Sequence, residues 1–227
     1  FERAAELAPT SITARLRATE MHYRSMRATF DREGMADALA LIRQAVRVDP
    51  LALHPDATSA IAKEAFDDHL ESLHLASALL CMDRTGHGVT REQFLTLAQE
   101  AYDYTHLILL RTPRPSSQYL ALHAVNCLDL GRVRDAEDAF YAALDAMKAE
   151  GDRGEVYYWV PTALRNTDFL TLGPDERERF LETYWENQDP TQLTLVNERQ
   201  LQYWRNLTIA RLYMELNRSG IPGGSIC

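Results

Sequence analysis

The chain has 227 residues and a net charge of -9 at pH 7, with 46% hydrophobic and 25% charged residues. This length suffices for one large domain or two modest ones, and the composition is typical of a globular protein. The acidic balance argues against nucleic acid or an anionic membrane surface as a partner, because both attract clustered positive charge. No apolar run approaches the roughly 20 residues that a membrane-spanning helix needs.

The N-terminal segment predicts a helical repeat pattern. The chain starts at Phe1 inside what reads as the closing half of one repeat, so we expect an N-terminal portion to precede it. A long helix is predicted from about 11 to 32, with a break at Gly34. A second helix is predicted over 35–48, ended by Pro50.

The first long predicted helix carries a candidate partner-binding stripe of arginines. Arg17, Arg24 and Arg27 recur at spacings that place them near one helix face. A basic stripe of this kind suits a partner rich in carboxylates. The alternative is an ordinary solvated face balanced by neighbouring acidic residues, and both interpretations stay open.

The middle of the chain predicts a helical hairpin, with helices over 58–82 and 91–110. The first of these helices is expected to be amphipathic. The connection beginning at Asp83 resembles a calcium loop only superficially, because a single carboxylate cannot supply the charge that a hard cation requires. Thr90 followed by Gln93 instead predicts a capping box at the start of the second helix.

The clearest pattern lies between residues 118 and 151. After a turn at Gly131, the residues Ala136, Phe140 and Ala143 resemble the second helix of a tetratricopeptide repeat. A small alanine lets two helices approach closely, and the phenylalanine fills the groove on the same face. Helix pairs of this kind stack on their neighbours and form a concave surface suited to binding other proteins.

The composition changes after residue 151. All three tryptophans, Trp159, Trp185 and Trp204, follow this point. A helix is predicted from 174 to 185 and a last one over 195–217. Tyrosine and tryptophan often contribute binding energy at interfaces, so Tyr158 and the three tryptophans are candidate partner-binding residues. The alternative is that these aromatic stripes pack as core.

The segment 175–214 resembles the opening half of the GWxTD domain, a bacterial family of unsettled function. The likeness is carried by Glu178, Phe180, Trp185, Asp189-Pro190, Asn197-Glu198, Arg205, Ala210 and Tyr213. The Gly-Trp-x-Thr-Asp motif, which leads into the strand-rich second half of the domain, is absent. Residues 219–224 stand where that second half would begin. The resemblance implies an exported, periplasmic protein with a binding role, and it supplies no catalytic residue.

No pattern in the chain predicts catalysis, a cofactor or a metal centre. Ser116 precedes a helix and is expected to be its N-cap, without the glycines of a nucleophile elbow. The seven histidines lack metal-ligand spacing, and so do the three cysteines.

These observations predict an all-α protein. We expect a tetratricopeptide-like α-solenoid of helical hairpins over 1–151, followed by an aromatic-rich helical module over 152–227. The function hypothesis is a non-catalytic interaction scaffold, an accessory subunit docking onto a larger assembly such as a membrane-associated electron-transport or photosynthetic complex. The expected partners are therefore proteins, with no nucleic acid and no membrane span of the chain's own.

Two alternatives stay open. One is an exported enzyme or ligand-binding protein whose active half lies outside this chain. The other is a cytoplasmic regulatory scaffold.

Overall fold

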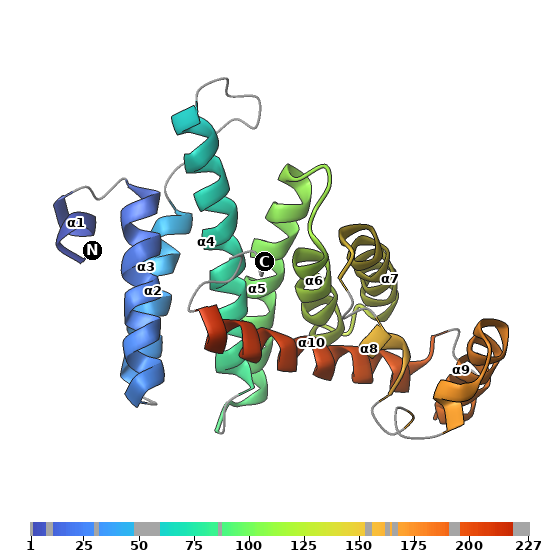
Figure 1. Ribbon diagram of the computed structural model, residues 1–227. Helices are drawn as coiled ribbons and strands as arrows, with labels where there is room; N and C mark the ends of the chain where they lie inside the picture. Colours follow the sequence, from blue (N-terminus) through green and yellow to red (C-terminus); the bar gives the residue numbers. More distant parts are fainter. Residues whose placement is uncertain are drawn as a thin grey trace. The chain divides into compact units, whose positions relative to one another are not determined.

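The computed structural model describes residues 2–7, 11–29, 32–47, 60–85, 88–152, 156–161, 164, 168–190 and 196–219. Within these ranges the chain is helical and has no strand, which confirms the all-α prediction (Figure 1). The α-helices are α1 (Glu2–Leu7), α2 (Ile12–Thr29), α3 (Arg32–Val46), α4 (Ala60–Arg84), α5 (Arg91–Arg111), α6 (Ser117–Asp129), α7 (Val133–Glu150), α8 (Val156–Trp159), α9 (Pro174–Gln188) and α10 (Glu198–Ser219). A short 3₁₀ helix covers Asp168–Thr171.

The chain forms two compact units. Unit 1 comprises residues 1–114 and 211–227, and unit 2 comprises residues 115–210. Helix α10 therefore begins in unit 2 and ends in unit 1. This division groups α6 and α7 with the aromatic segment, whereas the sequence suggested a domain boundary at residue 151; that domain assignment stays a prediction.

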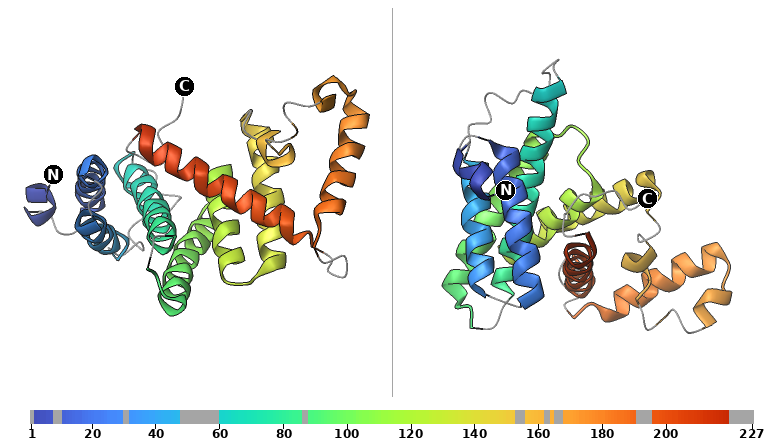
Figure 2. Two further views of the ribbon diagram at one scale, coloured as in Figure 1. Left: turned by 90° about the horizontal axis from the view of Figure 1, so that it is seen from below. Right: turned by 60° about the vertical axis from the view of Figure 1, so that its left-hand side comes forward.

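Unit 1 contains two antiparallel hairpins, α2/α3 and α4/α5, with α4 packed against α2, α3 and α5 (Figures 1 and 2). Several small side chains of these helices are fully buried: Ala18, Ala38, Ala45, Ala98 and Ala101. Alanine at such positions allows close approach of the helix axes, because it places no bulky group between the backbones. The tetratricopeptide-like solenoid over 1–151 stays a prediction.

Helix α4 departs from the amphipathic pattern that we expected. Every side chain from Ser72 to Cys81 is buried, so this stretch has no solvent face. Its hydroxyl groups find acceptors inside the protein: Ser72 donates to the Asp68 carbonyl at 2.7 Å, and Ser77 donates to the Ala101 carbonyl on α5 at 3.1 Å. A helix buried all round needs such internal partners for its polar groups, because water cannot supply them.

The break between the first two long helices precedes Gly34. Helix α2 ends at Thr29 and α3 begins at Arg32, so Gly34 lies in the first turn of α3. A glycine there weakens the helix by less than about 1 kcal/mol, which the buried face of α3 outweighs.

In unit 2, α6 and α7 form an antiparallel hairpin. Ala136, Phe140 and Ala143, which carry the repeat-like spacing, are all buried. The open end of the hairpin is closed by Glu150, whose carboxylate accepts hydrogen bonds from the Ser117 backbone N–H at 2.9 Å and from the Ser117 hydroxyl at 2.6 Å. As predicted, Ser116 caps α6, and its hydroxyl accepts from the Tyr119 N–H.

Each helix of this hairpin is followed by a glycine in the left-handed conformation. Gly131 has φ +76° and Gly151 has φ +72°. At the turn between α6 and α7, the Arg132 N–H donates to the Cys127 carbonyl at 2.9 Å and the Gly131 N–H donates to the Leu128 carbonyl at 3.0 Å. This pair of bonds is the Schellman motif, which satisfies carbonyls that a helix end would leave open.

We expect Gly131→Ala to lower the free energy of unfolding by about 1–2 kcal/mol, because alanine is strained at positive φ. The space around an added Cβ is open, so the loss reflects the backbone alone. Gly131→Asn serves as the matched control and should lose less, since asparagine tolerates this conformation. Urea unfolding measures both; equal losses for Ala and Asn would contradict the explanation.

Candidate functional site

An aromatic cluster forms the centre of unit 2. It consists of Phe140 and Tyr141 on α7, Trp159 on α8 and Trp204 on α10. Trp204 is 1% exposed, and its ring centroid lies 5.6 Å from that of Phe140 and 5.4 Å from those of Tyr141 and Trp159. Its indole N–H donates to the Tyr158 carbonyl at 2.7 Å. The cluster thus joins three helices around one buried indole whose single donor is satisfied.

Three of the four predicted aromatic binding residues are buried. Tyr158 is 1% exposed, Trp185 is 6% exposed and Trp204 is 1% exposed. Tyr158 shares a hydrogen bond with the Thr208 hydroxyl at 3.0 Å, and the Trp185 indole donates to the Trp159 carbonyl at 3.3 Å. These side chains pack in the interior of unit 2, as the core alternative held, so they can support a binding surface but not form its outer layer.

Trp159 differs from the other three, because it is only half-buried. Beside it lies Tyr141, which is 42% exposed and was not singled out from the sequence. Their ring centroids are 6.0 Å apart. Only the position of Tyr141 one residue after Phe140 in the repeat-like helix could have indicated it, since that offset turns the side chain away from the core.

A buried ion pair also stabilises unit 2. The Arg205 guanidinium donates from Nε to the Asp129 carboxylate at 2.6 Å, and the two side chains are 16% and 3% exposed. The pair connects α10 with the last residue of α6. Removing either partner would leave a buried charge without compensation, so we assign this contact to stability.

The predicted basic stripe lies on α2. Arg17 is half-buried. Arg24 and Arg27 belong to the helix, but their side chains lie outside the described residues. Whether the arginines form one binding surface therefore stays a prediction.

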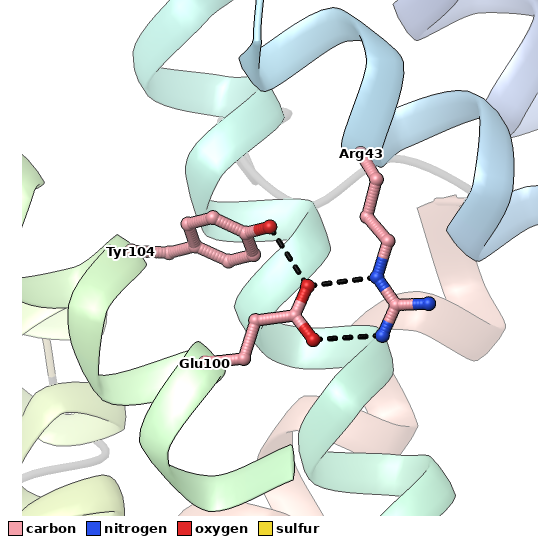
Figure 3. Close-up of polar contacts among 3 residues, drawn as sticks. All are labelled: Arg43, Glu100 and Tyr104. Atoms are coloured by element: carbon pink, nitrogen blue, oxygen red, sulfur yellow. Dashed lines mark hydrogen bonds and ion pairs between the residues drawn. The ribbon is translucent and has the colours of Figure 1, made fainter. Parts of the chain in front are cut away.

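A polar cluster that the sequence did not indicate links α3 and α5 in unit 1 through long side chains (Figure 3). Arg43 on α3 binds Glu100 on α5 with two parallel hydrogen bonds, each 2.7 Å long. The Tyr104 hydroxyl donates to the same carboxylate at 2.8 Å. Partial burial alone would raise the pKa of Glu100, but the hydrogen bonds from Arg43 and Tyr104 outweigh it and lower that pKa.

This cluster connects two consecutive hairpins rather than the two helices of one hairpin. The hydrogen bond to Glu100 and the negative charge of the same carboxylate raise the pKa of Arg43, so the pair stays charged over the physiological range. With both partners charged and paired, the cluster offers no free acid or base for catalysis. Its geometry suits the fastening of α3 to α5.

We expect a double-mutant cycle of Arg43→Gln and Glu100→Gln to give a coupling energy of about 0.5–1 kcal/mol, because both side chains stay partly hydrated. Arg47→Gln combined with Glu100→Gln is the matched control, since Arg47 acts on Glu100 through charge only and should couple more weakly. Urea unfolding at low salt measures both cycles. Equal coupling energies in the two cycles would show that the two hydrogen bonds contribute nothing beyond the attraction between the charges.

Two histidines are buried in α4. His69 is 1% exposed and His74 is 2% exposed. Burial lowers the pKa of both to about 4, and the charge of Arg111 adds to the effect at His69. Both imidazoles are therefore neutral at pH 7 and unsuited to act as acid–base groups there.

The sign of the resulting pH dependence follows from the lowered values. Between pH 6.5 and pH 4, His69 and His74 become protonated in the unfolded chain but stay neutral in the folded chain. The free energy of unfolding therefore falls as pH falls through this window. We expect a loss of about 1.4 kcal/mol per pH unit for each histidine. Helix unfolding followed by circular dichroism at pH 5 and pH 7 measures it.

His74→Leu should remove about half of this slope, because one of the two buried imidazoles is then gone. An unaltered slope in His74→Leu would contradict the assignment.

Both cysteines that the structure describes are buried. Cys127 lies 3.5 Å from the His123 Nε2, but burial raises the pKa of its thiol to about 12, so it is not a nucleophile at neutral pH. Cys81 is likewise buried.

Thr90 and Gln93 form the predicted capping box, with the Gln93 N–H donating to the Thr90 hydroxyl at 3.2 Å and the Thr90 N–H donating to the Gln93 side chain at 2.9 Å.

In the part of the chain that the structure describes, no cluster of three or more His, Cys, Asp or Glu side chains has the arrangement of a metal site. None of the described helices combines the length and the apolar character needed to cross a membrane. Comparison of the chain with protein-family models, with curated proteins and with solved structures found no match.

Proposed function

We propose that this chain is a non-catalytic scaffold that binds other proteins, as an accessory subunit of a larger assembly. One observation carries the proposal: α4 of the second hairpin packs against both helices of the first. Packing of one hairpin on the next is how repeat proteins extend their surface, and such surfaces are used to hold protein partners. The finer proposal is a tetratricopeptide-like solenoid over 1–151.

The C-terminal segment supports the same function and a particular setting for the protein. The resemblance of 175–214 to the GWxTD domain supports a bacterial, extracytoplasmic protein. An extrinsic subunit of a membrane-associated electron-transport or photosynthetic complex is the form of the proposal that fits this setting. The half-buried Trp159 and the predicted arginine stripe of Arg17, Arg24 and Arg27 are the features that would meet such a partner.

The proposal is tested by chemical cross-linking in the native cell, followed by purification of the tagged chain and mass spectrometry of the linked peptides. We expect cross-links from this chain to a small and reproducible set of proteins, and co-elution with them at a mass well above that of the chain alone. A chain that elutes as an uncross-linked monomer would contradict the proposal.

The arginine stripe is tested in the same experiment. Reversing the charge at Arg17, Arg24 and Arg27 to Glu should lower the recovered partner about tenfold or more, because several charge-assisted contacts are lost together. The matched control reverses three exposed arginines elsewhere, Arg91, Arg134 and Arg199. Equal loss in both variants would show that only the net charge matters.

A further inference from the structure

The outer side of the aromatic cluster combines exposed rings with a rigid support. Tyr141 is 42% exposed and Trp159 is half-buried, and both rings contact buried Trp204 at nearly right angles, 84° and 86°. Trp204 is itself held by its hydrogen bond to the Tyr158 carbonyl. The two outer rings therefore need little ordering when a ligand binds, which lowers the entropic cost of binding.

Two carboxylates accompany Tyr141 on α7. Glu137 lies one turn before Tyr141 on the same face of α7, and the exposed Asp138 follows it. Burial and the charge of Asp138 raise the pKa of Glu137, and burial followed by Glu137 raises the pKa of Tyr141. A partly desolvated carboxylate thus lies beside Tyr141, where a cation would lower its energy.

Two phenylalanine rings of the chain each lie against an arginine of the chain itself. The Arg84 guanidinium lies 6.0 Å from the centre of the Phe94 ring, and that of Arg177 lies 5.9 Å from the centre of the Phe169 ring. Those rings receive a cation from the chain itself. At Glu137 the charge of Arg134 on the same helix opposes the raised pKa without reversing it, so two carboxylates stand against one guanidinium of the chain itself.

We propose that the surface formed by Glu137, Asp138, Tyr141 and Trp159, here called the acidic aromatic face, binds an arginine- or lysine-bearing segment of a protein partner. The ring faces attract a cation and the carboxylates pair with it. Arginine fits best, because its planar guanidinium can stack on a ring while its N–H groups reach a carboxylate. The inference rests on the proposed function and specifies the chemistry of the partner.

The test uses a hexaarginine peptide as the probe and the full chain as the receptor. Binding is followed by NMR of the tryptophan indole N–H signals during titration at low salt and at 0.15 M salt. We expect the Trp159 signal to shift, and Tyr141→Ala and Glu137→Gln each to weaken binding about 5- to 10-fold. A hexaglutamate peptide should cause no shift.

The matched control is Glu182→Gln, which removes the same charge from an exposed position on α9 in the same unit. It should bind hexaarginine as the parent chain does. Equal weakening by Glu137→Gln and Glu182→Gln would overturn the inference, because binding would then depend on net charge alone. No weakening by Glu137→Gln would overturn it as well. Circular dichroism of each variant confirms that the fold is kept.

The two proposals fail in different ways. If cross-linking recovers partners and Tyr141→Ala leaves their recovery unchanged, the scaffold function stands and the acidic aromatic face is not the contact. If no partner is recovered, the scaffold function fails, and the peptide titration still decides whether the face binds cations.

Discussion

The complete burial of α4 is the constraint on which unit 1 depends. From Ser72 to Cys81 no side chain reaches solvent, so every polar group in this stretch requires a partner inside the protein or must stay neutral. Serine hydroxyls meet backbone carbonyls, one of them across the hairpin on α5. His74 stays uncharged, and so does His69 just before the stretch. The neighbouring helices can then pack on α4 from more than one side, and this allows one hairpin to rest on the next.

Unit 2 solves the related problem of burying a large aromatic side chain. Trp204 has one hydrogen-bond donor, and the Tyr158 carbonyl accepts it. Its remaining surface contacts other rings, so the indole costs no unsatisfied polar group and contributes a large apolar area. Because Trp204 is fixed, the rings that touch it are fixed as well. The half-buried and exposed rings around Trp204 are therefore ordered by this core packing.

Much of the local structure could be predicted from the sequence, because its causes are local. Thr90 and Gln93 lie three residues apart and form the expected capping box. Ala136, Phe140 and Ala143 share one face of α7 and are buried as their spacing indicated. Helix α5 begins at the expected residue, since a cap sets its start. In each case the residues that decide the outcome are neighbours along the chain.

Features that depend on distant parts of the chain were not predictable in this way. Arg43 and Glu100 are separated by 57 positions, and neither has a neighbour that marks it as paired. The burial of Ser72, Ser77 and His74 requires helices on several sides of α4, which its own periodicity does not reveal. Trp159 and Trp204 occur in similar aromatic patterns, yet only Trp204 is buried. Periodicity identifies a face, but the neighbours of that face decide its exposure.

The contact between Glu150 and Ser117 has a consequence for how the α6/α7 hairpin opens. The turn at Gly131 joins the helices at one end, and the Glu150 carboxylate ties them at the other. Neither helix can fray from its free terminus without first breaking two charge-assisted bonds. Amide hydrogens at the start of α6 should therefore exchange with deuterium only when the whole hairpin unfolds, so that the hairpin behaves as a single cooperative unit.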